Sequence, residues 1–198
     1  MFLTKTYELF GGAPTFNFDT AEPAFLTNSI GAITIDLPID LTDASDLRQV
    51  PDTQEVFLAN DSGVSVVVEI LERVAPDDPN QVAKFHFDSL AHDNEATSST
   101  VEAISTPAAQ PNPLVLSVLQ GTQLVPKFNR TNPDTVKILL AVYRALDKGI
   151  DLVLTFNIPI QTEKAGSAVT GAESLKEWID AYETAVSSFK ILDYGLFA

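Results

Sequence analysis

Six carboxylates within twenty residues are the densest group of chemically useful side chains in the sequence. Residues 36–55 hold a single base, Arg48, and the six acids, which are Asp36, Asp40, Asp43, Asp46, Asp52 and Glu55. Such a run is typical of a solvated face, of a docking surface that steers a cationic partner by charge, or of the paired acids of a glycosidase. The stretch has no aromatic residue to hold a sugar. The residues alone therefore favour a solvated face or a docking surface over a catalytic pair.

The two histidines are the other candidates for chemistry. His86 lies in residues 82–88, whose alternating apolar positions predict a strand with His86 on the opposite face, either half exposed or hydrogen-bonded. His92 precedes Asp93 in what we expect to be a polar loop, which is a weak indication of a metal site. Two histidines cannot form a three-histidine metal site, and with no cysteine the chain has no thiolate nucleophile or disulfide. Since phosphate-loop and nucleophile-elbow motifs are also missing, we predict no catalytic residue, no cofactor and no metal.

Three short elements are expected to position the acidic stretch. Residues 33–37 alternate and stop at Pro38, which predicts a strand. Residues 43–49 predict one or two helical turns with an acidic start. Residues 53–59 predict the next strand. The carboxylates would then lie at the junction between a short helix and a strand.

The remaining elements predict an α+β fold with a mostly antiparallel sheet and a long C-terminal helix. Strands are expected at 64–74 and 114–120, and residues 136–158 are interpreted as a hairpin that turns at Asp147-Lys148-Gly149. Residues 173–190 place apolar side chains three and four apart and predict an amphipathic helix. The apolar residues of that helix are expected to pack on the sheet.

Composition limits the classes of partner. The chain has 198 residues, which suits one domain spanning 1–198, and it holds 27 acidic against 12 basic residues for a formal net charge of −15. So acidic a surface repels phosphates and anionic lipids, and we expect no nucleic-acid partner. No segment approaches the roughly 20 apolar residues of a membrane span, and no secretory signal begins the sequence. We therefore expect no membrane insertion, a place in the cytosol or nucleus, and a monomer.

Five blocks of the sequence carry a family resemblance. They are residues 8–13, 43–57, 85–88, 151–157 and 192–197. In this order they resemble the Mog family, the Ran guanine-nucleotide release factors of nuclear transport. The similarity extends from residue 8 to the end. The block 43–57, which contains Val-Pro-Asp-x-Gln-Glu-Val-Phe, is long and ungapped and argues against chance similarity.

The resemblance implies a fold and a function. The fold is that of the photosystem PsbP proteins, an α/β/α sandwich whose mostly antiparallel central sheet lies between helices. The function is binding of the GTPase Ran, release of its nucleotide without enzymatic chemistry, and support of nuclear protein import in nucleus and cytoplasm. The alternatives are a Ran-binding adaptor without exchange activity and a PsbP-like lumenal protein, against which block 43–57 argues. The family motif assigns Ran binding to Asp52 and Glu55, with Asp43, Asp46 and Gln54 as their neighbours.

One segment departs from the family pattern. About 19 residues, 14–32, separate the Gly-Gly-Ala step from the strand at 33–37, although the family runs directly from one to the other. The segment has no clear hydrophobic period. It is either an inserted surface loop, which costs little stability, or a translated intron of a gene model.

Overall fold

The structure is a computed structural model that describes residues 3–10, 32–107, 114–128 and 130–197. Of the predicted insertion at 14–32, only Ala32 lies within the described residues.

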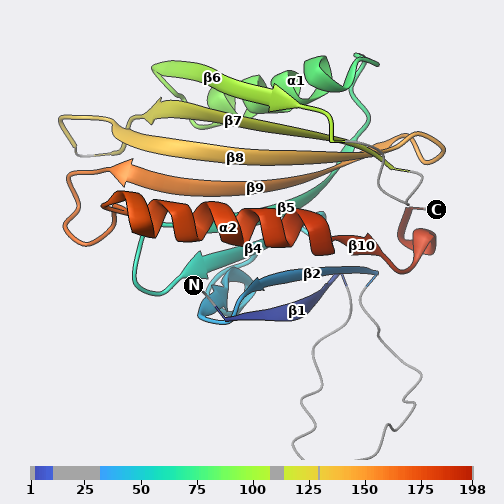
Figure 1. The fold of residues 1–198 in the computed structure, drawn as a ribbon, viewed down its shortest axis with the longest axis horizontal. Coiled ribbons are helices and arrows are strands. Elements are labelled where there is room, and N and C mark those ends of the chain that lie inside the picture. The colour runs from blue at the N-terminus through green and yellow to red at the C-terminus, as the bar shows by residue number, and fades with distance from the viewer. Residues whose placement is uncertain (1–2, 11–31, 108–113, 129, 198) are drawn as a thin grey trace, which may run out of the picture.

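A seven-stranded sheet forms the middle layer (Figure 1). Each neighbouring pair in it is antiparallel. In spatial order the strands are β3 (Leu41–Asp43), β4 (Gln54–Ala59), β5 (Ser65–Glu72), β9 (Ile150–Gln161), β8 (Asp134–Ala145), β7 (Val115–Val125) and β6 (Ser98–Ser105). The two longest strands, β8 and β9, lie near its centre and form the predicted hairpin.

A smaller sheet and two helices complete the layers. The smaller sheet has the order β1 (Thr4–Leu9), β2 (Ile33–Pro38) and β10 (Lys190–Ile191). Helix α2 (Ala172–Ser188) crosses the front of the large sheet in Figure 1, with β1 and β2 below it, and α1 (Pro79–Asp93) lies behind β6 and β7. Two short 3₁₀ turns are η1 (Ala44–Asp46) and η2 (Tyr194–Phe197). The predicted sandwich is therefore confirmed, with the second sheet sharing the layer of α2.

The larger hydrophobic core lies between the large sheet and the layer of α2. The apolar stripe predicted for 173–190 is confirmed, because Trp178 and Tyr182 are buried in this core with residues of β8 and β9. Alternate residues of β2, among them Ile33 and Ile35, enter the same core from the smaller sheet.

The strand predicted at 82–88 is wrong, because these residues belong to α1. Asp78 caps the helix by accepting hydrogen bonds from the N–H groups of Asn80 (2.9 Å) and Gln81 (3.1 Å), and Pro79 occupies the first helical turn. The ring of Phe87 packs where β7 has Gly121, at which an added Cβ would lie 2.7 Å from that ring. The tertiary contacts of the buried helix face outweigh the local alternation.

The other strand predictions are confirmed with shifted ends, whereas β1, β3, β6 and β10 were not predicted. The helix expected at 43–49 shrinks to the three residues of η1.

Candidate functional site

The acidic segment forms the connection between β3 and β4, and its own hydrogen bonds fix its shape. Asp43 ends β3, and its side chain caps η1 by accepting a hydrogen bond from the N–H of Ser45 (2.8 Å). The N–H of Arg48 then donates to the carbonyl of Ala44 (2.9 Å). The Asp-Ala-Ser sequence thus ends a strand and starts a turn with one capping carboxylate.

Asp52 lies in the following turn, where its carboxylate faces solvent. The N–H of Gln54 donates to the carbonyl of Pro51 (2.9 Å), which closes the turn around Asp52. Asp46 is exposed as well, and neither carboxylate forms an ion pair with another described residue. Two acids are therefore presented to solvent on a connection of defined shape.

Glu55 is held differently from Asp52. It is half buried on β4, and its Oε1 accepts a hydrogen bond from the backbone N–H of Phe10 (2.9 Å), directly after β1. Burial raises the pKa of Glu55, the Phe10 hydrogen bond opposes this, and the Asp43 carboxylate raises it further. Glu55 therefore both carries a partly desolvated charge and ties β4 to the end of β1.

Gln54 points to the other face of the sheet. Because side chains alternate along a strand, the side chains of Gln54 and Glu55 point to opposite faces of the sheet. Nε2 of Gln54 donates to Oε1 of Glu69 on β5 (2.5 Å). Burial raises the pKa of Glu69, the Gln54 hydrogen bond lowers it, and the nearby Asp93 carboxylate raises it. Gln54 and Arg48 line a groove of about 540 Å³ on this face.

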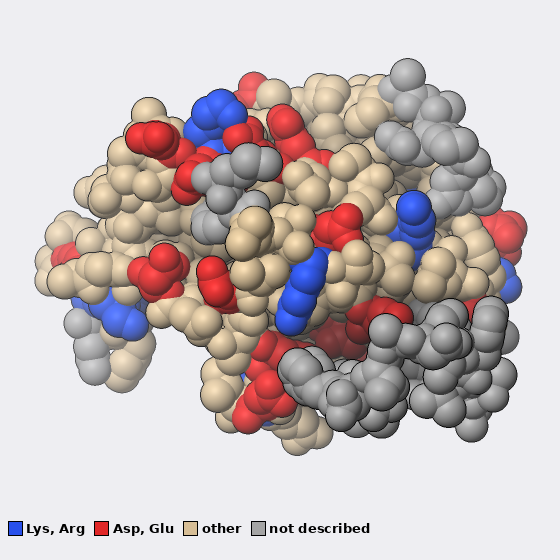
Figure 2. Space-filling view, turned by 60° about the horizontal axis from the view of Figure 1, so that its bottom comes forward, with Lys and Arg blue, Asp and Glu red and all other residues tan. Residues whose placement is uncertain are grey.

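The structure thus separates the five predicted residues. Asp43 and Glu55 interact on the α2 side, Asp46 and Asp52 are exposed on the connecting turns, and Gln54 faces the groove. Sequence reasoning did not predict that Phe10 would donate a hydrogen bond to Glu55, or that Glu69 would accept one from Gln54. The alternation of β4 was the available signal for the separation of Gln54 from Glu55. Figure 2, which brings the side of β1 and β2 toward the viewer, shows acidic side chains spread over this part of the surface.

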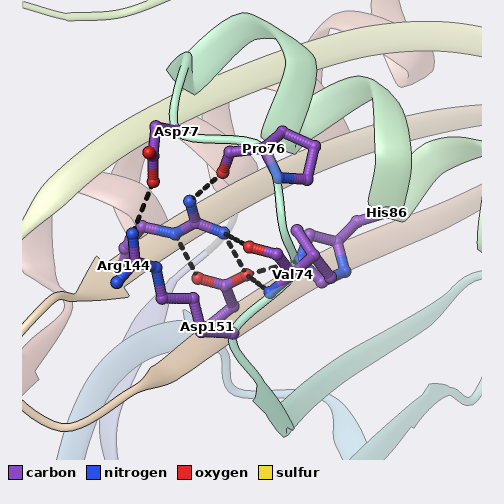
Figure 3. A network of polar contacts seen from close by, with 7 residues as sticks. Val74, Pro76, Asp77, His86, Arg144 and Asp151 are labelled. Atoms are coloured by element: carbon purple, nitrogen blue, oxygen red, sulfur yellow. Dashed lines mark hydrogen bonds and ion pairs between the residues drawn. The ribbon is translucent and has the colours of Figure 1, made fainter.

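His86 belongs to a buried polar network and not to a half-exposed strand face. It lies on α1 with 5% of its surface exposed, and its Nε2 is 3.0 Å from Oδ2 of Asp151. Arg144 donates to the same carboxylate from Nε (2.7 Å) and Nη2 (2.8 Å), as Figure 3 shows. Its guanidinium also donates to the carbonyls of Val74 (3.0 Å) and Pro76, which precede α1.

This network fixes the position of α1 on the sheet. Burial alone would raise the pKa of Asp151, but hydrogen bonds from Arg144, His86 and the N–H of Val74 together hold that pKa well below its usual range. The three side chains join β8, β9 and α1. Their mutual pairing satisfies charges that would otherwise be costly to bury, so we interpret His86 as a structural residue.

The described residues include no cluster of three or more histidines and carboxylates that could hold a metal ion. His92 is exposed in the last turn of α1, not in a loop. Within the described part of the chain, no helix is long and apolar enough to cross a membrane.

Solved structures with this architecture define its fold class. The crystal structure of the Saccharomyces cerevisiae Ran-binding protein Mog1p matches the full length of both chains, with a TM-score of 0.72 and 24% identity. A structure of a glutamate-to-alanine mutant of protein Mog1 matches 85% of this chain and 95% of its own, with a TM-score of 0.67 and 26% identity. The fold is therefore that of the Mog1 proteins.

Sequence comparison gives the family. The sequence model of the Ran-interacting Mog1 protein matches residues 30–159. The Ran guanine nucleotide release factor of Bos taurus is 32% identical over 180 residues, which cover 84% of this chain and 92% of the relative. That of Danio rerio is 28% identical over 175 residues, covering 84% and 96%. The chain belongs to the Ran-interacting Mog1 family, which is named for an interaction and not for a catalysed reaction.

Proposed function

We propose that this protein binds the GTPase Ran through the connection between β3 and β4, promotes release of its guanine nucleotide, and supports nuclear protein import. It acts as a monomer in nucleus and cytoplasm, without enzymatic chemistry, a nucleic-acid partner or membrane insertion. Ran binding and nucleotide release are what the relatives are named for. The observation that carries the proposed site is the exposed carboxylate of Asp52, which forms no ion pair with any described residue and lies on a hydrogen-bonded turn beside the half-buried Glu55.

The geometry supports different roles for the two acids. Asp52 is free to pair with a basic side chain of the GTPase and to speed association by charge. Glu55 already accepts the N–H of Phe10, so it can either contact Ran itself or hold the end of β1 in the shape that Ran contacts.

Nucleotide release follows from binding alone. A protein that binds nucleotide-free Ran more tightly than loaded Ran must weaken nucleotide binding by the same factor, since the two equilibria are linked. The acids act by binding the GTPase, and no bond is made or broken.

The first test is release of labelled GTP and GDP from purified Ran, with and without this protein, at about 150 mM salt to screen unspecific attraction. Faster release of one nucleotide is expected. Binding in a parallel pull-down without faster release would replace the exchange activity with the adaptor alternative. Absence of both binding and release would contradict the proposed function.

Three variants then separate the roles of the acids. Asp52→Ala is expected to weaken Ran binding about fivefold, mainly by slower association, because it removes one exposed charge. Glu55→Gln keeps an acceptor for Phe10 but removes the charge, whereas Glu55→Ala removes both. Equal losses in both Glu55 variants would assign Glu55 to direct contact, and a loss confined to Glu55→Ala would assign it to positioning.

The matched control is Asp147→Ala, an exposed acid in the turn between β8 and β9. It changes net charge as Asp52→Ala does, and Ran affinity should stay at the unsubstituted level. If Asp52→Ala also leaves affinity unchanged, the assignment of the turn is wrong.

A further inference from the structure

The groove on the α1 side of the large sheet has a floor of both polar and apolar side chains. In the described residues, α1 packs on β6, β7 and β8, and the groove opens beyond the last turn of the helix, over β4, β5 and β9. The polar side chains of its floor are Gln54, Ser65, Glu69, Thr155 and Asn157, and the apolar ones include Val56, Val67 and Val136. The opposite faces of these strands enter the hydrophobic core. The groove therefore combines hydrogen-bonding groups with apolar surface.

The charge of the groove is opposite to that of the protein. Four of the 12 basic residues line it, but only three of the 27 acidic residues do. The cations are Arg48, Lys127, Arg130 and Lys164, and the anions are Glu69, Asp93 and Asp134. In a chain with a net charge of −15, this is a local basic site.

Three of these cations are available to a ligand. Arg130 is occupied, because its Nη1 donates to both carboxylate oxygens of Asp134 (2.8 and 2.9 Å). The side chains of Arg48, Lys127 and Lys164 are exposed and form no ion pair with any described residue. They come from three separate connections, β3–β4, β7–β8 and β9–α2, so positive charge is distributed around the rim.

The lining favours an extended acidic chain over a nucleotide. No aromatic side chain among the described lining residues could stack on a base. The side-chain amides of Gln54 and Asn157 can bond to the backbone of an extended peptide, while spaced cations suit successive carboxylates.

We propose that this groove binds an extended, acidic peptide segment of a partner protein. The groove lies on the other face of β4 from Glu55, although Arg48 belongs to the same β3–β4 connection that is proposed for Ran and Gln54 borders both regions. Peptide binding is measured without Ran, so its result does not depend on nucleotide release. The groove gives the protein a second binding surface, opposite in charge to the first.

The test measures binding of a fluorescein-labelled twelve-residue peptide of alternating Glu and Ser, at about 150 mM salt. A Gln-Ser peptide of equal length is the neutral probe. The triple variant Arg48→Glu, Lys127→Glu, Lys164→Glu is expected to lose at least about tenfold in affinity for the Glu-Ser peptide, because three charge contacts become repulsive. Because the three side chains are exposed, the tertiary packing is expected to be retained, which near-ultraviolet circular dichroism checks.

The matched control reverses three cations outside the groove that form no ion pair with any described residue, by Lys5→Glu, Lys148→Glu and Lys190→Glu. Of these, Lys5 lies over the ring of Tyr7 at 4.3 Å from its centroid. The control imposes the same change in net charge, and affinity should stay within about twofold of the unsubstituted protein. In the unsubstituted protein, the peptide should shift the side-chain amide signals of Gln54 and Asn157 in ¹H–¹⁵N spectra.

Four results would overturn the proposal. They are no binding of the Glu-Ser peptide, equal binding of the Gln-Ser peptide, equal losses in the two triple variants, and amide shifts produced by inorganic pyrophosphate but not by the peptide. The last would make the groove a site for small anions. If the groove variant does not fold, the amide shifts in the unsubstituted protein decide the matter alone.

Discussion

The two faces of the seven-stranded sheet are covered in opposite ways. On the α2 face, aromatic rings pack together: Tyr143 stacks on Phe189 with centroids 4.1 Å apart, and Phe156 meets Tyr182 edge-on at 5.5 Å. On the α1 face, the helix covers one end of the sheet over a second, smaller hydrophobic core, and a groove lined by both polar and apolar side chains occupies the other end. The α2 face is thus closed by apolar packing over its length, whereas part of the α1 face is left open to solvent.

The α2 face therefore contributes mainly to stability, whereas the α1 face also carries the groove proposed for binding. The α2 face gains its stability from buried apolar area, which does not depend on charge. The α1 face depends on charge twice, in the buried pairing of Arg144 with Asp151 and in the exposed cations of the groove. Substitutions that change charge should therefore affect the α1 face far more than the α2 face.

Breaking the buried network should have the largest effect. Asp151→Ala leaves the Arg144 guanidinium buried without its carboxylate, and is expected to lower the free energy of unfolding by about 3–5 kcal/mol. Urea denaturation measures this. The double variant Arg144→Met, Asp151→Leu should cost less than the single one, because no buried charge is left unpaired. A loss below about 1 kcal/mol in Asp151→Ala would show that the network does not hold α1.

Two tyrosine hydroxyls on the α2 face should differ in their contribution to stability, and both contributions should be smaller than that of the buried network. The Tyr143 hydroxyl donates to the carbonyl of Val186 (2.9 Å), whereas the buried Tyr182 hydroxyl has no hydrogen-bond partner among the described residues. Tyr143→Phe should cost about 1 kcal/mol, and Tyr182→Phe should be neutral or slightly stabilising. Thermal denaturation distinguishes them, and equal losses would mean that both hydroxyls are satisfied.

The smallest expected effect is a dependence of stability on pH from two half-buried glutamates. The pKa values of Glu55 and Glu69 are raised above 4.5, chiefly by burial, so their contribution to stability is present below about 4.5 and is lost as pH rises through the folded-state values. Acidification from pH 7 toward pH 5 should therefore raise the melting temperature.

Glu69→Gln, on the groove side of the sheet, and Glu55→Gln, on the α2 side, should each reduce the rise in melting temperature between pH 7 and pH 5. Asp151 does not contribute in this window, because its pKa is lowered and its stabilisation is lost only in stronger acid. An unchanged pH profile in both variants would contradict the raised pKa values.

Elements with a strong local pattern were predictable. The hairpin of β8 and β9 and the stripe of α2 follow from alternation and helical spacing that agree with their tertiary contacts. Helix α1 was mispredicted because Phe85, His86 and Phe87 alternate in polarity. His86 is nevertheless buried, since the carboxylate of Asp151, distant in sequence and itself paired with Arg144, accepts a hydrogen bond from its ring.

The candidate site was predictable only in part. The density of acids and the family motif point to Asp52 and Glu55, and their role in binding Ran stays a prediction. The groove could not be predicted, because its lining comes from strands and connections spread along the chain. The pairing of Glu55 with the N–H of Phe10 joins residues 45 positions apart and leaves no local signal.

The smaller sheet has a consequence for biosynthesis. Strand β2 pairs with β10, where Ile33 lies opposite Ile191, and α2 packs against β2. A ribosome makes Ile33 long before Ile191, so the apolar side of β2 waits for α2 and β10 to be translated before its cover exists. A nascent chain therefore depends on these later elements to shelter β2, and premature termination before α2 would leave that strand exposed to chaperones and proteases.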